Sequence, residues 1–276
     1  MSEITDQVLE QFAGTPEPRL REIMLALTRH LHAFAAEVEL TEEEWWAGVE
    51  FLTATGRITS GVRQEFVLLS DVLGLSSLVV GQTHDHDDLE HTDATLLGPF
   101  YVEQSPPRPL GDSITRTDDG EPVLFRGRIV DPGGAPLPGA RIDVWQTASN
   151  RLYDVQDPGQ EPGNMRGTFR TGADGRYRFR TVRPVSYPIP DDGPVGRLLA
   201  ATGRHPWRAA HVHFKISADG HETLVTQIYD ADNAYVGSDA VFGVRESLVR
   251  TFVPVTEPEW DGLLVEQDFV LARTPG

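Results

Sequence analysis

Two histidines one residue apart, His211 and His213, have the spacing in this chain that most directly suggests chemistry. Side chains at positions i and i+2 of a β-strand share a face, so the apolar segment 211–216 would offer two imidazoles to one metal ion. The chain has no cysteine, which excludes thiolate sites and leaves zinc, copper, manganese or iron. The alternative is a strand on which backbone carbonyls satisfy both histidines.

Two other metal patterns fit less well. A cupin-like site would need a glutamate about four residues after the histidine pair, and Ser217 stands there. Positions 84, 86 and 88 resemble the His-x-His-x-Asp-His signature of metallo-hydrolases, but Leu89 occupies its last histidine position. We interpret the segment from Thr83 to Asp88 as a solvated acidic hinge rather than a metal site.

The first 80 residues or so have helical periodicity. Apolar residues recur at three- and four-residue steps and form one stripe, namely Leu20, Ile23, Met24, Leu27, Leu31 and Phe34. Thr41 and Glu44 fit a capping box, Gly56 is expected to end the helix that follows, and a further helix is predicted over about 62–78. The stripe could be a docking or dimerisation surface, or it could pack onto the rest of the chain.

The remainder has the alternation and turn signals of an all-β domain. Strands are predicted at 123–130, 141–146, 177–179, 211–216, 224–229 and 263–271. The predicted fold class is therefore mainly β, a β-sandwich preceded by helices. We place the helical domain at residues 1–92 and the sandwich at residues 93–276.

Composition narrows the function classes. The 276 residues carry a formal net charge of −18, which argues against nucleic acid or anionic lipid as a partner. No run approaches the roughly 20 apolar residues of a membrane span, and the acidic N-terminus lacks an apolar signal core; a cytoplasmic location is expected. An anionic substrate would need a local arginine or a metal ion.

Oxygen ligands for the ion are harder to choose. Tyr187 lies among alternating prolines that fix an extended backbone, which suits a rigid ligand. Tyr153 has no flanking prolines of this kind. Either tyrosine could instead be an ordinary aromatic residue with a hydrogen-bonded hydroxyl. Spacing alone does not select these two from the 6 tyrosines of the chain.

Several motifs, in order along nearly the whole chain, resemble the intradiol ring-cleavage dioxygenases, which include catechol and hydroxyquinol 1,2-dioxygenases. They are Gly98-Pro99-Phe100, the run 139–146, Leu152-Tyr153-Asp154, Arg166-Gly167, the run 174–177, the run 187–196 and the run 204–213. The N-terminal helices are similar to that family's linker and dimerisation domain. The resemblance implies a homodimer through these helices, with phospholipid in an apolar tunnel at the interface.

The resemblance also implies a mononuclear Fe(3+) site held by Tyr153, Tyr187, His211 and His213. Phenolate oxygens are hard anionic donors that suit ferric iron. The substrates would be a small aromatic diol and O2, with Tyr187 also acting as a base. Arg208 would stabilise negative charge that develops on the substrate, and Gln227 would be a second polar residue of the site.

The substrate pocket implied by the resemblance comprises Leu68, Asp71, Leu97, Gly98, Pro99, Phe100, Ile189, Pro190 and Val241. Asp71 could accept a hydrogen bond from a third ring hydroxyl, and the run 238–244 is more similar to hydroxyquinol enzymes. We therefore expect cleavage of hydroxyquinol (benzene-1,2,4-triol). Tyr101 stands where those enzymes often have histidine, so catechol or a substituted catechol is the alternative.

A hypothesis from another class uses the same β segments. The runs 127–131, 136–140 and 174–179 also resemble non-enzymatic carboxypeptidase-regulatory-like β-sandwich modules, which act as binding domains. A shared sandwich does not imply a shared function. Those modules lack the paired tyrosines and histidines, so the four ligand positions favour the enzyme.

Overall fold

The computed structural model describes residues 2–61, 63–84, 91–116 and 120–274. The chain forms two compact units, Met1–Arg57 and Ile58–Gly276. The first unit holds α1 (Glu3–Ala13), α2 (Pro18–Glu37) and most of α3 (Glu42–Ile58). Within it α1 packs on α2, where the hydroxyl of Thr5 lies 3.0 Å from Nδ1 of His32.

The predicted stripe lies on α2, and its large apolar side chains are about half exposed; Leu27 is 52% exposed and Phe34 51%. The capping box that precedes α3 is confirmed. The backbone N–H of Glu44 donates to Oγ1 of Thr41 at 3.3 Å, and the N–H of Thr41 donates to the Glu44 carboxylate at 3.0 Å. The helix continues two residues beyond Gly56, where it was expected to end.

The second unit contains α4 (Glu65–Val72), α5 (Leu75–His84) and α6 (Pro194–Ala201). The prediction of one helix over 62–78 is wrong, because the chain breaks between α4 and α5. Gly74 has φ +74° there, a left-handed conformation that ends helices and that glycine adopts without a Cβ penalty. The expected hinge from Thr83 to Asp88 is wrong at its first two positions, since Thr83 and His84 still belong to α5. Its remaining residues, 85–88, lie outside the described residues.

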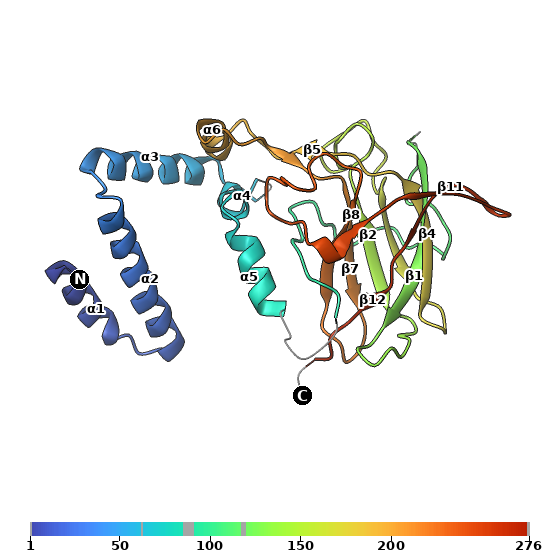
Figure 1. Cartoon of the computed structure of the whole chain (residues 1–276), viewed down its shortest axis with the longest axis horizontal. Coiled ribbons are helices and arrows are strands. Elements are labelled where there is room, and N and C mark those ends of the chain that lie inside the picture. The colour runs from blue at the N-terminus through green and yellow to red at the C-terminus, as the bar shows by residue number, and fades with distance from the viewer. Residues whose placement is uncertain (1, 62, 85–90, 117–119, 275–276) are drawn as a thin grey trace. The chain divides into compact units, whose positions relative to one another are not determined.

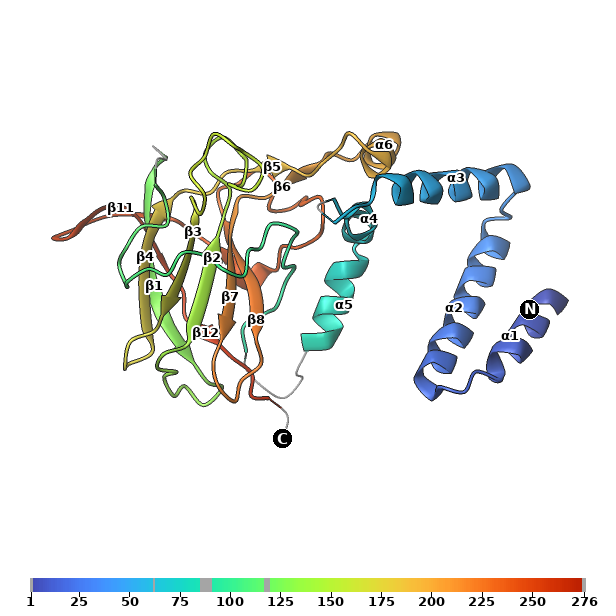
Figure 2. The ribbon, with the colours of Figure 1, turned by 180° about the vertical axis from the view of Figure 1, so that it is seen from behind.

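The strands of this unit form two five-stranded sheets and a small two-stranded sheet (Figures 1 and 2). The first sheet runs β10-β11-β1-β12, with β4 on the other side of β1; its strands are β1 (Pro122–Val130), β4 (Arg176–Val182), β10 (Val253–Glu257), β11 (Trp260–Glu266) and β12 (Phe269–Val270). The second runs β3-β2-β7-β8-β9; its strands are β2 (Arg141–Trp145), β3 (Arg166–Arg170), β7 (His211–Ser217), β8 (Leu224–Asp230) and β9 (Val249–Arg250). The two-stranded sheet pairs β5 (Tyr187–Pro188) with β6 (Trp207–Arg208) in antiparallel direction.

The core lies between the two sheets, as the predicted β-sandwich requires. Phe125 of β1 and Phe179 of β4 stack with ring centroids 5.1 Å apart, and both meet Phe214 of β7 edge-on at 5.8 and 5.9 Å. These contacts join one sheet to the other through large apolar rings. The predicted fold class is confirmed.

The last predicted strand, 263–271, is two strands rather than one. β1 pairs in parallel with β11 up to Arg126 and with β12 from Ile129. Between them a Cβ on Gly127 would meet the carbonyl oxygen of Gln267 at 1.8 Å. The chain kinks into this space, which only glycine leaves open.

No single helix in the described ranges is both long and apolar enough to span a membrane. One bent pair, α4 with α5, meets the length and composition criteria together, with 78° between its two helices.

Candidate metal centre and substrate pocket

Strand β7 divides its residues between the two faces of its sheet. Val212, Phe214 and Ile216 point into the core between the sheets, so His211 and His213 point to the opposite face. The strand register extends this outer face sideways: Trp145 of β2 lies opposite His213, and Gln227 of β8 lies on its other side. The histidines are nevertheless only 2% and 1% exposed, because loops cover them.

The four predicted ligands converge beneath these loops. The phenol oxygen of Tyr153 lies 3.2 Å from that of Tyr187 and 3.1 Å from Nε2 of His213. The Nε2 atoms of His211 and His213 are 3.1 Å apart. Donors that share one ion at about 2.0–2.2 Å each lie about 3 Å from their neighbours. The separations therefore fit a single metal ion.

Both tyrosines reach the site from short, well-tethered segments. Tyr153 follows a turn closed by the bond from the Ala148 N–H to the Leu152 carbonyl, and its own N–H donates to Oε1 of Gln156 at 3.1 Å. Tyr187 is held by the pairing of β5 with β6, where it lies opposite Arg208. The proline-rich segment thus fixes Tyr187 against the strand that leads into β7.

The protonation states of the histidines suit metal binding. Nδ1 of His211 lies 2.6 Å from the Ala209 carbonyl, and its Nε2 lies 3.3 Å from Nη1 of Arg208, which can only donate. The proton therefore belongs on Nδ1, and Nε2 presents its lone pair. Burial, with a smaller contribution from Arg208, lowers the pKa of His211 to about 3. Burial, followed by His211 and Arg208, also lowers the pKa of His213.

An ion bound between the two histidines would need the tyrosines for its remaining donors. Over the ranges that the structure describes, no three His, Cys, Asp or Glu side chains form a possible metal site. Burial and the neighbouring Tyr187 raise the pKa of Tyr153 well above its usual value. A cation at the point of convergence reverses this effect, because it favours the anionic phenolate. Such a cation would balance the negative charge of buried phenolates.

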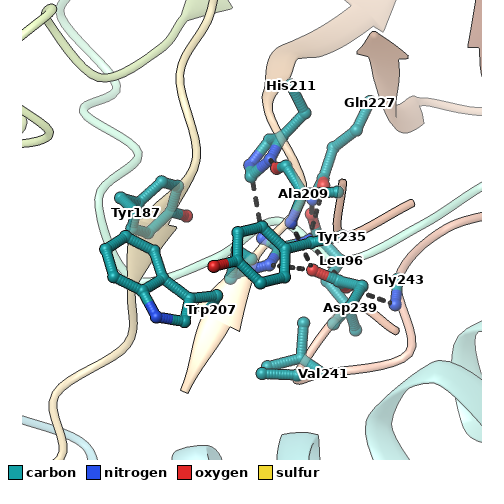
Figure 3. A network of polar contacts seen from close by, with 12 residues as sticks. Leu96, Tyr187, Trp207, Ala209, His211, Gln227, Tyr235, Asp239, Val241 and Gly243 are labelled. Carbon is teal, nitrogen blue, oxygen red and sulfur yellow. Dashed lines mark hydrogen bonds and ion pairs between the residues drawn. The ribbon is translucent and has the colours of Figure 1, made fainter. Parts of the chain in front are cut away.

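Arg208 is a buried cation beside this cluster, and Figure 3 labels two of its hydrogen-bond partners, Gln227 and Asp239. Its Nη2 donates to Oε1 of Gln227 at 2.9 Å, and Gln227 in turn donates from Nε2 to the Leu96 carbonyl at 2.6 Å. Tyr229 closes the network by donating to the same Oε1 at 2.6 Å. The three predicted catalytic residues Tyr187, Arg208 and Gln227 are thus brought together.

The carboxylate of Asp239 pairs with Arg208. Burial alone lowers the pKa of Arg208, but Asp239 and two neighbouring phenol groups raise it well above its usual value. Burial raises the pKa of Asp239, but the charge of Arg208 and its hydrogen bond outweigh burial, so the pKa of Asp239 lies below its usual value. Both groups are therefore ionised at neutral pH.

A cavity of about 550 Å³ opens beside Tyr187 and Arg208, within the size range of small-molecule sites. Eight of the nine predicted pocket residues line it, namely Leu68, Asp71, Gly98, Pro99, Phe100, Ile189, Pro190 and Val241. Leu97 is not among its lining residues, whereas its neighbour Leu96 is. Tyr101, Val155 and Gln156 also line it. Burial raises the pKa of Asp71, against smaller opposing effects from Ser76 and Arg208.

Four buried side chains around the site were not selected from the sequence. Asp239 and Tyr229 hold Arg208, and Trp145 stacks on His213 with ring centroids 4.6 Å apart. Arg166 lies under Tyr153. The alternation of β2 and β8 could have pointed to Trp145 and Tyr229. Arg166 and Asp239 lie in motifs of the family resemblance, but only the three-dimensional pairing shows which residues they contact.

Comparisons with known proteins agree with this architecture. The family model described as "Dioxygenase" matches residues 96–273, and "Catechol dioxygenase N terminus" matches residues 17–91. A hydroxyquinol 1,2-dioxygenase of Rhizobium sp. (strain MTP-10005) is 47% identical over 97% of this chain and 94% of that protein.

Two solved structures are similar over almost the whole chain. Hydroxyquinol 1,2-dioxygenase from Pseudomonas putida DLL-E4 has a TM-score of 0.94 and 46% identity, covering 98% of each chain. Catechol 1,2-dioxygenase from Acinetobacter sp. ADP1 has a TM-score of 0.83 and 31% identity, covering 99% of this chain and 93% of that one. With both family models matched and such similarity along its length, the chain belongs to the intradiol ring-cleavage dioxygenases.

Proposed function

We propose that this dioxygenase uses ferric iron to cleave hydroxyquinol between its two adjacent hydroxylated carbons. Both atoms of O2 enter the product, 3-hydroxy-cis,cis-muconate, which tautomerises to maleylacetate. The observation that carries the proposal is the convergence of two phenol oxygens and two imidazole nitrogens, with successive separations of 3.1–3.2 Å. Tyr153, Tyr187, His211 and His213 would hold the iron.

Ferric iron at this point would act as a Lewis acid that lets an ortho-diol bind as an anion. Tyr187 both belongs to the ligand cluster and lines the cavity, so as a phenolate it could accept a proton from a diol hydroxyl. Arg208 also lines the cavity and supplies a fixed positive charge for negative charge that develops on the ring. Gln227 keeps that guanidinium in place.

Two observations favour hydroxyquinol over catechol. The hydroxyquinol enzymes named above are 46–47% identical to this chain, whereas the catechol enzyme is 31% identical. Asp71 also lines the cavity, and its carboxyl group can accept a hydrogen bond from a third ring hydroxyl, which catechol lacks. A non-enzymatic binding module is set aside, because the chain is a member of a dioxygenase family.

The iron and its ligands can be tested by colour. Phenolate-to-iron charge transfer should make the purified protein red-brown, and Tyr153→Phe should weaken or shift the absorption band. Tyr177→Phe is a matched control, because Tyr177 is equally buried but donates to the Gln267 carbonyl in the other sheet. A colourless wild-type protein that takes up no iron would reject the proposed centre.

The substrate can be tested by oxygen uptake. We expect one O2 per hydroxyquinol cleaved and a kcat/KM for hydroxyquinol well above that for catechol. A catechol rate far above the hydroxyquinol rate would instead support the catechol alternative, while leaving the reaction type unchanged.

We further propose that residues 1–92 form a dimerisation domain that binds phospholipid at the interface of a homodimer. The half-exposed apolar stripe on α2 supports this, because a surface of that kind is stabilised by a partner. Mass in solution should correspond to twice the 30.5 kDa chain, and organic extraction should release lipid. A monomer without extractable lipid would reject both ideas. The cytoplasmic location stays a prediction, which fractionation of cells would test.

A further inference from the structure

A buried arginine lies in the same cross-strand row as one of the histidines. In the second sheet, Trp145 lies opposite His213 on one side and opposite Arg166 of β3 on the other. Residues directly opposite each other point to the same face, so Arg166 shares the face that carries the metal cluster. Its side chain is 2% exposed, which is rare for arginine and requires paired neighbours.

The backbone before Arg166 has an unusual conformation. Met165 is fully buried and has φ +58°, a left-handed conformation that is uncommon for residues other than glycine. Two backbone bonds hold it there, from its N–H to the Ile114 carbonyl and from the Gln146 N–H to its own carbonyl. Retained strain of this kind is concentrated at functional sites, and here it sets where β3 begins.

The guanidinium of Arg166 joins two segments of the site. Its Nε donates to Oδ1 of Asp154 at 2.6 Å, and its Nη1 donates to the Phe100 carbonyl at 2.7 Å. The other oxygen of Asp154 accepts from the Gly163 N–H at 2.9 Å. Arg166 therefore ties the loop that carries Tyr153 to the segment that lines the cavity.

These contacts close a ring around Tyr153. Asp154 is the next residue in the chain, and the Phe100 ring stacks on the Tyr153 ring with centroids 4.5 Å apart. The guanidinium carbon of Arg166 lies 6.0 Å from the centre of the same ring. Tyr153 is thus fixed by Phe100, by Asp154 and by Arg166, which connects the other two.

We propose that Arg166 is the positioning residue for the Tyr153 ligand and the Phe100 wall of the cavity, an inference that rests on the proposed iron site. The two hydrogen bonds from the Arg166 guanidinium, to Asp154 and to Phe100, set the direction of the Tyr153 phenol oxygen. The positive charge of Arg166 stabilises electrons on that oxygen. Removing the charge raises the energy of those electrons, so charge transfer to iron should need less energy.

The test compares Arg166→Met and Arg166→Lys with the wild type, each loaded with ferric iron. Arg166→Met should move the charge-transfer band to longer wavelength and weaken iron binding about 10–100-fold in competition with a chelator. Arg166→Lys keeps the positive charge but loses the planar guanidinium that donates to Asp154 and Phe100 together. Its band should therefore lie nearer the wild-type position, while its iron affinity stays reduced.

Arg108→Met is the matched control. Arg108 is also buried, and it donates to the carbonyls of Arg166 and Ile114. Its loss should lower stability to urea but leave the band where it is. Circular dichroism establishes which variants fold. If Arg166→Met does not fold, the comparison of Arg166→Lys with the wild type decides the question.

The outcomes separate the two proposals. A wild-type protein without a charge-transfer band overturns the iron site itself. If a folded Arg166 variant keeps both the band position and the iron affinity of the wild type, only the role of Arg166 is overturned. An equal band shift in Arg108→Met also overturns it, because the effect would then come from general loosening of the fold.

Discussion

Arg208 and Asp239 form an ion pair that is closed to solvent, with Nε of Arg208 3.2 Å from Oδ1 of Asp239. The same carboxylate accepts the N–H of Ala209 at 3.0 Å and the N–H of Gly243 at 2.9 Å. It therefore connects the strand that leads to the histidines with the turn after Val241, a residue of the cavity wall. Together with Gln227 and Tyr229, this carboxylate fixes the position of the guanidinium.

Asp239→Asn should be strongly destabilising, because it leaves Arg208 buried without a counter-charge. Loss of one partner of a buried ion pair typically costs about 3–5 kcal/mol, which urea unfolding would measure. Turnover should fall as well, since Arg208 is no longer held. Glu266→Gln, which removes an exposed partner of Arg126, is the control and should change stability by about 1 kcal/mol or less. Equal effects of the two changes would contradict the role given to Asp239.

Gln227→Leu should reduce turnover while leaving the iron colour in place. Gln227 bridges Nη2 of Arg208 and the Leu96 carbonyl, but it lies outside the proposed ligand set. Loss of a hydrogen bond to a charged group corresponds to about 1.5–3 kcal/mol, or about a 10- to 150-fold fall in kcat/KM. Steady-state oxygen uptake measures this, and the visible spectrum serves as the internal control. A lost band would mean that Gln227 acts on the metal centre instead.

Asp71→Leu should narrow the preference for hydroxyquinol over catechol. The change removes the proposed partner of the third hydroxyl, so the rate with hydroxyquinol should fall by about tenfold or more while the rate with catechol holds or rises. The ratio of kcat/KM values for the two diols, measured for both proteins, reports this directly. Leu68→Ala alters the same cavity wall without a hydrogen bond and should affect both diols alike.

Asp71→Asn should stabilise the protein at pH 7. Burial raises the pKa of Asp71 in the folded protein, so the native state holds the proton at pH values where the unfolded chain has released it. The favourable contribution of Asp71 is therefore complete below the unfolded pKa of about 3.9 and is lost as pH rises through the raised native pKa. The gain from Asp71→Asn should shrink as pH falls toward 4.

Urea unfolding at several pH values would check this, with Asp157→Asn as a control of opposite sign. The N–H of Gly159 and the side chains of Asn150 and Gln160 lower the pKa of Asp157. Asp157→Asn should therefore lose stability at neutral pH, and the loss should vanish in acid. Parallel pH profiles for the two variants would contradict the assigned directions.

Much of the scaffold could be predicted from local patterns, because most strands and helices have a hydrophobic periodicity that is visible in their own sequence. The alternation of β7 indicated which face carries His211 and His213. The helix break at Gly74 and the kink opposite Gly127 escaped prediction, since each depends on how a backbone approaches another segment. Family resemblance, rather than spacing, selected Tyr153 and Tyr187 among the tyrosines.

The supporting residues of the site could not be predicted in the same way. Asp239 lies 31 positions from Arg208, and Arg166 lies 66 positions from Phe100. Nothing in the local sequence shows that either pair meets, because strand register and loop closure decide it. Leu96 rather than Leu97 lines the cavity wall, and the local sequence does not distinguish these two leucines.

The division of β7 between core and metal cluster also restricts how this strand can change. Inserting or deleting one residue ahead of His211 would exchange its two faces, driving imidazoles between the phenyl rings of the sandwich and Val212 toward the tyrosines. Inserting or deleting two residues would leave each side chain of the strand on its original face. Length variation in descendants of this protein should therefore accumulate in the covering loops, while the strand evolves by substitution alone.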